Sequence, residues 1–114
     1  MPHLNEHEQQ SIEHFGKSYT EVHQFLDQFQ PQFRGPEHRR ILHHTMGVNE
    51  VVRRFGEETR SVVELHIKED WKGYCGSHYV PTLKEIDLDN WLLLNYNVKE
   101  YMDNLMMELY SEKL

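Results

Sequence analysis

The chain has 114 residues, of which 38% are hydrophobic and 27% charged, with a formal net charge of −7 and a single cysteine. This length and composition predict one soluble globular domain. The acidic balance argues against general nucleic-acid binding, which depends on neutralising phosphates. One cysteine excludes an intrachain disulfide.

No apolar run approaches the roughly 20 residues that a membrane-spanning helix needs, and the first residues lack the basic and apolar regions of a signal peptide. We therefore expect a cytoplasmic protein, and the lone Cys75 fits a reducing compartment. The expected single domain spans residues 1–114, with residues 96–114 as a C-terminal helical extension.

Helix-start patterns occur along the whole chain. A polar residue followed three positions later by glutamate, as in a capping box, is found at Asn5…Glu8, Ser18…Glu21, Ser61…Glu64, Thr82…Glu85 and Asn97…Glu100. Glycines that can end a helix stand at Gly16, Gly56 and Gly73. These signals predict helices at about 6–15, 19–29, 36–55, 62–72 and 98–112, with short turns near 83–95.

No segment alternates with a period of two residues, so no strand is expected. We predict an all-α protein, a compact bundle of four to five helices around a long central helix at about 36–55.

Two of the expected helices carry the pattern His-x-x-x-Asp, as His23 with Asp27 and as His66 with Asp70. A spacing of four residues places the imidazole and the carboxylate on one helix face. The second pair lies among apolar residues and should face the core. The first pair should lie at the edge of an apolar face.

The expected central helix holds three histidines within seven residues, at His38, His43 and His44. At about 100° per residue, His44 shares an apolar stripe that also includes Glu37. His43 falls on the opposite side, among arginines. We therefore predict that His44 faces the core and that His43 faces solvent or a partner.

The loop expected at residues 73–82 holds Cys75 and His78. These two could form a thiolate–imidazole pair, although a lone cysteine in a loop is more often incidental.

The last expected helix carries an apolar stripe of Val98, Met102, Leu105 and Leu109. This stripe predicts either a homodimer interface or packing onto the same domain.

The chain also resembles a family of small, histidine-rich bacterial and phage proteins catalogued only as a domain of unknown function. The resemblance covers roughly residues 4–93 and rests on His7 with Phe15-Gly16, Tyr19 with His23 and Asp27, His38-Arg39 with His43-His44 and Gly47, Phe55-Gly56, His66 with Asp70, Pro81-Thr82 and Trp91. It implies that these histidines form a recurring set, and it implies no activity or ligand. Residues 74–79 look like an insertion relative to this family.

The strongest functional hypothesis is a metal site inside the bundle. Histidines and carboxylates that face inward from several helices can hold zinc, iron or manganese. We predict that the ligands are His23, Asp27, His44, His66 and Asp70, with His7, His38 and His43 in reserve. The alternative is that each histidine is a buried polar group satisfied by its own aspartate.

A bound ion would make metal-dependent hydrolysis of a phosphoester the expected chemistry. The adjacent His-Asp pair of familiar helical phosphohydrolases is absent, since His43-His44 stands in its place. No pattern in the sequence identifies a catalytic residue.

A different class of function is a non-enzymatic binding module, phage- or bacteria-encoded by the resemblance. All six arginines lie between residues 34 and 60, and the same stretch contains only four glutamates. An exposed face of Arg39, Arg40, His43 and Arg54 could bind an anionic ligand such as a nucleotide, or a protein partner. A solvated helix face without a ligand is the plainer explanation.

Overall fold

The computed structural model describes the backbone of residues 4–111 and the side chains of residues 6–111. Every regular element in this range is helical, which confirms the all-α prediction. The helices are α1 (Leu4–Phe15), α2 (Thr20–Leu26), α3 (Arg39–Leu42), α4 (Thr45–Phe55), α5 (Arg60–Cys75), α6 (Leu83–Leu88) and α7 (Tyr96–Ser111), with short 3-10 turns η1 (Gly35–His38) and η2 (Glu57–Thr59). None of these helices is long and apolar enough to cross a membrane.

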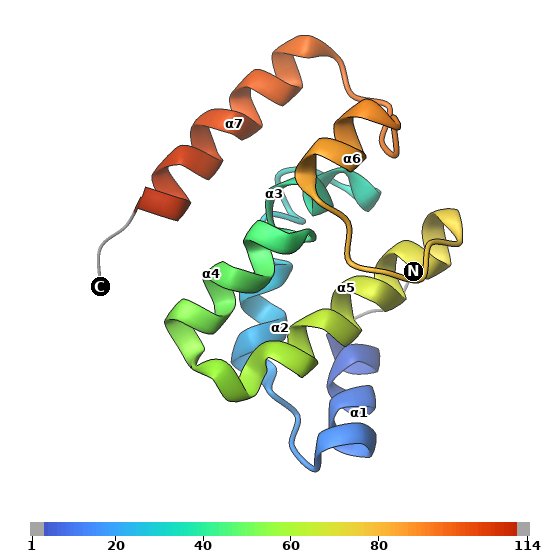
Figure 1. Ribbon diagram of the computed structural model, residues 1–114, viewed down its shortest axis with the longest axis vertical. Coiled ribbons are helices and arrows are strands. Elements are labelled where there is room, and N and C mark those ends of the chain that lie inside the picture. Colours follow the sequence, from blue (N-terminus) through green and yellow to red (C-terminus); the bar gives the residue numbers. More distant parts are fainter. Residues whose placement is uncertain (1–3, 112–114) are drawn as a thin grey trace.

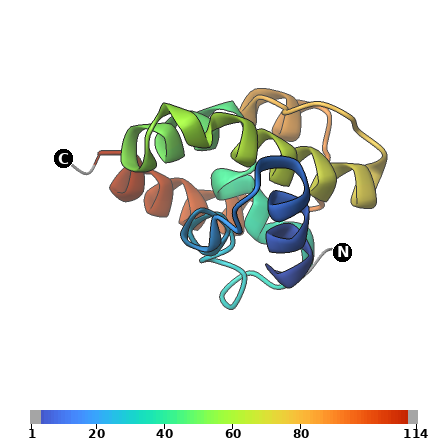
Figure 2. The same cartoon turned by 90° about the horizontal axis from the view of Figure 1, so that it is seen from below.

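Helices α4 and α5 form the centre of the molecule. They are joined by the tight turn η2 and pack against each other, as Figure 1 shows. Helices α1 and α2 pack together and against α5, and they lie side by side beneath it in Figure 2. Helix α7 lies on the other side of the molecule, where it contacts α3.

The segment expected to be one long helix at 36–55 is divided into η1, α3 and α4, which corrects the prediction. The chain leaves the helical path at His43 (φ −88°, ψ 58°) and is extended at His44 (φ −158°, ψ −177°). The backbone N–H of Thr45 then donates to the carbonyl of Pro81, 2.9 Å away, instead of continuing the helix. A contact with a residue far along the chain thus interrupts a segment whose apolar periodicity is helical.

Gly47 makes this interruption possible. A Cβ atom at this position would lie 1.6 Å from the carbonyl oxygen of Leu42. Only glycine allows the first turn of α4 to approach the end of α3 this closely.

Several expected helix boundaries also differ. Thr82 and Glu85 do form a complete capping box, but it starts α6, which lies in the region expected to hold only turns. Gly73 does not end α5, which continues to Cys75 and ends before Gly76 (φ 79°). The last helix begins at Tyr96, and position 112 of the predicted helix 98–112 lies outside the described residues.

The apolar core takes residues from helices α2 to α7. Its buried residues are Val22, Leu26, Phe33, Ile41, Leu42, Val48, Val51, Val62, Val63, Ile67, Trp71, Ile86, Leu92, Met102, Met106 and Leu109. The stripe of the last helix therefore packs onto its own chain, with Met102 fully buried and Val98 and Leu105 partly buried against this core. Whether the protein also forms a dimer stays a prediction.

Arg40 fixes the position of α6 and α7. Its side chain is 4% exposed, and it donates two hydrogen bonds of 2.9 Å to the carboxylate of Asp87 in α6. It also lies 2.9 Å from Asp103 Oδ1 in α7 and donates to the carbonyl of Lys99. One buried guanidinium therefore holds three segments together.

Candidate metal centre

Four side chains from distant parts of the sequence meet inside the molecule. Asp27 is the residue that follows α2, His43 lies at the break between α3 and α4, and His66 and Asp70 are one turn apart on α5. One oxygen or nitrogen atom from each residue lies within 4.8 Å of the other three. We call Asp27, His43, His66 and Asp70 the four-residue cluster.

The distances within the cluster suit a metal ion. Asp70 Oδ2 lies 2.9 Å from His43 Nε2 and 3.2 Å from His66 Nε2. Asp27 Oδ1 lies 3.3 Å from His66 Nε2 and 3.5 Å from His43 Nε2. Ligand atoms at about 2.0–2.1 Å from a tetrahedral ion stand about 3.3 Å apart. The same distances also fit hydrogen bonds in a metal-free network.

Asp70 is the most heavily contacted carboxylate of the cluster. It is 2% exposed, and its Oδ1 lies 3.1 Å from His7 Nε2 and 3.5 Å from Arg39 NH2. Burial alone would raise the pKa of Asp70. The facing imidazoles of His43, His66 and His7 outweigh burial and hold this pKa well below its usual range. Asp70 is therefore an anion, which is the form that binds metals.

Asp27 is the more accessible carboxylate, with its side chain 17% exposed. Its Oδ1 faces His43 and His66, and also His38 Nε2 at 3.5 Å. Burial is again outweighed, by the imidazoles of His38, His43 and His66, so the pKa of Asp27 lies well below its usual range. His38 itself is oriented by its Nδ1–H, which donates to the carbonyl of Gly35 at 2.8 Å. Its Nε2 is thereby directed toward Asp27.

His66 carries a proton in the absence of a metal. Burial opposes its charge, but the carboxylates of Asp27 and Asp70 overcome burial and raise the pKa of His66 to about 9. The imidazole of His43 is fully buried, and burial lowers its pKa. The cluster is thus two carboxylates with one protonated and one neutral imidazole.

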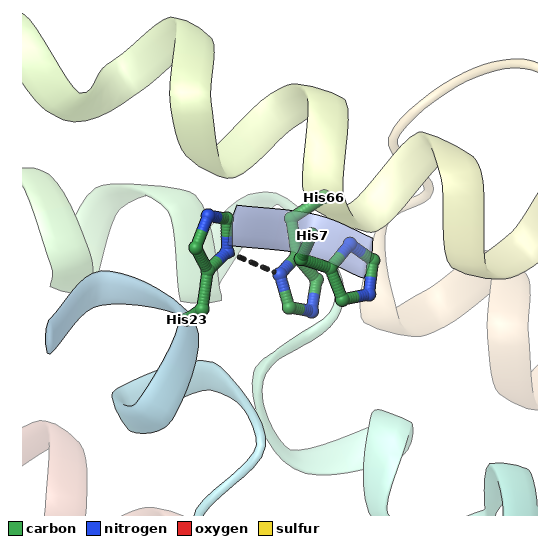
Figure 3. A group of neighbouring side chains, drawn as sticks. All are labelled: His7, His23 and His66. Atoms are coloured by element: carbon green, nitrogen blue, oxygen red, sulfur yellow. Dashed lines mark hydrogen bonds between the residues drawn. The ribbon is translucent and has the colours of Figure 1, made fainter. Parts of the chain in front are cut away.

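His7, His23 and His66 form a second group of buried histidines (Figure 3). The rings of His7 and His66 are stacked face to face, with centroids 3.6 Å apart and an angle of 14° between their planes. An imidazole binds a metal through a lone pair in the plane of its ring. Two rings stacked in this way direct these lone pairs poorly toward one ion, so the four-residue cluster is the better metal site.

His23 instead supports His66 by a hydrogen bond. The two Nδ1 atoms are 2.8 Å apart, as the dashed line in Figure 3 marks, and His23 Nε2 lies 2.6 Å from Ser11 Oγ. Burial is the main cause that lowers the pKa of His23 to about 3. His23 is therefore neutral and accepts the Nδ1–H of His66, which leaves His66 Nε2 directed at the carboxylates. Metal-binding histidines commonly receive this kind of support.

The structure thus brings together three of the predicted ligands, Asp27, His66 and Asp70. His44 lies outside both histidine groups. It is fully buried, as predicted, but its Nε2–H donates to the carbonyl of Arg40, 2.9 Å away. His43 takes the place beside Asp70 and is buried, which corrects its expected position facing solvent. The break in the helix is the cause, because it turns the ring of His43 inward.

Two further histidines complete the surroundings of the cluster. His7 from α1 and His38 from η1 are 1% and 2% exposed and reach Asp70 and Asp27. The sequence marked both only as reserves, because no periodic pattern relates them to the carboxylates they contact. Glu37, expected on the core side, is exposed.

The arginines expected to form one open face are turned to internal partners. Arg39 is 2% exposed and donates to the carbonyl of Asp70. Arg40 binds the acids of α6 and α7, and Arg54 binds Glu50, donates to the carbonyl of Leu109 and stacks on Phe25. The expectation of a shared, exposed arginine face is therefore wrong.

Cys75 is exposed at the end of α5, and His78 is exposed in the loop that follows. Within the described residues neither belongs to a group of side chains that could hold a metal ion.

The fold and the cluster define a small all-helical protein with a buried histidine–aspartate centre. A family model described as "Domain of unknown function (DUF6915)" matches residues 2–92, and the chain belongs to this family. The match includes every residue of the four-residue cluster and ends before α7. Neither the curated proteins nor the solved structures contain a match to the chain.

Proposed function

We propose that this protein binds one divalent transition-metal ion through Asp27, His43, His66 and Asp70. The observation that carries the proposal is that these four side chains, from three separate parts of the chain, bring their ligand atoms within 4.8 Å of one another in the interior. Imidazole nitrogen with carboxylate oxygen suits zinc, iron or manganese.

The competing explanation is a metal-free ionic network. The charges of Asp27 and Asp70 are balanced by Arg39 and by protonated His66, so the buried group has no net charge when no metal is bound. Such networks are costly to build, because each buried charge loses its hydration. A bound ion would displace the proton of His66 and attract both carboxylates at once, and this favours the metal-binding explanation.

The identity of the ion determines what the centre can do. Four protein ligands fill the coordination sphere of tetrahedral zinc, which is the arrangement of a structural site. Iron or manganese accepts about six ligands, so positions would remain for water and for a substrate oxygen.

The proposed reaction is hydrolysis of a phosphoester. The ion would lower the pKa of a bound water molecule. Water then adds to phosphorus, the bond from phosphorus to the alcohol oxygen breaks, and the alcohol leaves with a proton from the water. Asp70 and Asp27 hold the negative charge that keeps the ion in place.

The test is the metal content of tag-free protein, measured by elemental mass spectrometry. We expect about one equivalent of zinc, iron or manganese. The matched variants are Asp70→Asn, which removes a charge from the cluster, and Asp89→Asn, which removes one from an exposed position after α6. Metal lost in the first and kept in the second supports the site. Folded wild-type protein that contains no metal and takes up none on titration overturns it.

A further inference from the structure

A small cavity opens beside the four-residue cluster. It has a volume of about 150 Å³ and is lined by Pro36, Arg39, Asp70, Gly73 and Tyr74. Asp70 therefore belongs to the four-residue cluster and also lines this cavity. At Gly73 a Cβ atom would meet nothing within 4 Å, so there is space for a side chain at this position.

Arg39 lines the cavity and also carries a hydrogen-bond donor without a partner. Its guanidinium donates through NH1 to the carbonyl of Asp70 at 2.9 Å and lies over the ring of Trp71, with 5.9 Å to the ring centroid. Its Nε is buried and has no hydrogen-bond partner among the residues that the structure describes. A buried donor without a partner costs free energy, and an anion that accepts its hydrogen bond removes that cost.

We propose that this cavity is a subsite for a small oxyanion, the terminal phosphate of a phosphomonoester, with Arg39 as its recognition residue. The subsite itself depends only on Arg39 and the cavity walls. Its role in hydrolysis rests on the proposed metal centre, because Asp70 is shared by the two sites.

The size of the cavity selects the ligand. Clefts that hold drug-sized ligands measure roughly 300–1,000 Å³, so a cavity of about 150 Å³ admits a phosphate-sized group and not a whole nucleotide. A phosphodiester carries organic groups on both sides of phosphorus, whereas a monoester ends in the phosphate. Tyr74 also lines a wider groove of about 630 Å³ with Tyr79 and Trp91, which leaves room for the organic part of a monoester.

The test is calorimetric titration of inorganic phosphate into the protein loaded with the ion that it retains. The key variant is Gly73→Leu, whose side chain should fill the cavity without harming α5, since leucine favours helix. Gly73→Ala is the matched control, because it adds only one methyl group at the same position. Arg39→Lys keeps the charge and removes the Nε donor. Metal content and melting temperature are measured for every variant.

We expect phosphate to bind the wild-type protein, with affinity at least about tenfold weaker in Gly73→Leu and in Arg39→Lys and nearly unchanged in Gly73→Ala. Phenyl phosphate should displace inorganic phosphate, and diphenyl phosphate should not. Equal phosphate affinity in wild type and Gly73→Leu would place the anion elsewhere and overturn the subsite.

Failure of the subsite and failure of the metal centre can be told apart. Metal-loaded protein that does not bind phosphate overturns the subsite and leaves the metal centre intact. If the protein binds no metal, the metal centre fails. Titration of the metal-free protein then still decides the subsite, because the guanidinium and the cavity do not require the ion.

Discussion

The Nε2 atom of His43 lies 2.9 Å from Oδ2 of Asp70, although 27 positions separate the two residues in the sequence. This contact exists because the chain leaves the helical path at His43 and resumes it at Thr45. The neighbouring His44 is equally buried but bonds the backbone of its own segment. Two adjacent and equally buried histidines thus have different hydrogen-bond partners.

The adjacent pair gives a direct test of the metal centre. We expect His43→Asn to weaken metal affinity by at least about 100-fold, since it removes a ligand. His44→Asn should leave metal affinity within about threefold of wild type, although it will lower stability through the lost hydrogen bond of about 1 kcal/mol. Competition with a chromogenic chelator measures both affinities. Equal losses in the two variants would contradict the assignment of His43.

Removal of the metal should lower stability without unfolding the protein. The metal-free cluster remains internally hydrogen-bonded and neutral, and the apolar core does not involve it. At free metal of about 100 times the dissociation constant, binding to the folded state adds about 2.7 kcal/mol. Urea denaturation with and without a chelator measures this difference, and identical curves would argue that no ion binds the native state.

Gly47 should be among the least replaceable residues. A Cβ atom added at this position would lie 1.6 Å from the carbonyl oxygen of Leu42. The substitution Gly47→Ala should therefore force α3 and α4 apart. We expect a loss of at least about 3 kcal/mol in the free energy of unfolding, together with weaker metal binding through displaced His43. Gly73→Ala is the matched control, because a Cβ atom there would meet nothing within 4 Å, and it should stabilise the protein by about 0.5–1 kcal/mol. Similar effects in the two variants would refute the close approach.

Arg40 should be essential for the position of the last two helices. Arg40→Ala leaves the carboxylates of Asp87 and Asp103 without their shared partner. Because both acids are partly exposed, we expect a loss of about 3 kcal/mol, at the low end for breaking a buried ion pair. Amide hydrogen exchange should speed up in α6 and α7 and stay unchanged in α1. A uniform change along the chain would contradict this local role.

The acid stability of the protein should depend on Glu50. This side chain is 5% exposed, and although burial opposes its charge, Arg53 and Arg54 hold the pKa of Glu50 below its ordinary value. The lowered pKa stabilises the folded protein at pH values above the ordinary glutamate pKa of 4.5. This stabilisation is lost as the pH falls from that value through the lower folded pKa. The free energy of unfolding of Glu50→Gln should therefore fall less steeply over this interval. Parallel slopes for the two proteins would show that Glu50 does not contribute.

Much of the candidate site could be predicted locally. The pairs of His23 with Asp27 and of His66 with Asp70 follow from the four-residue spacing, and the second pair is in contact as expected, at 3.2 Å. In the first pair the expected contact is replaced by one between helices, since Asp27 meets His66 and His23 meets the other side of the same ring. The spacing of residues in the sequence determines which face of a helix their side chains share. The packing of the helices determines which residues of other helices that face contacts.

The sequence by itself determined the helical class, the apolar faces of the helices and the positions of side chains that can bind a metal. These features depend on residue type and on periodicity within a few helical turns. Only the tertiary structure decided that His43 and not His44 faces Asp70, that the arginines turn inward, and that His7 and His38 reach the carboxylates. The physical reason is that the bond from Thr45 to Pro81 and the close approach at Gly47 interrupt the helix. Helical periodicity carries no information about such contacts between distant residues.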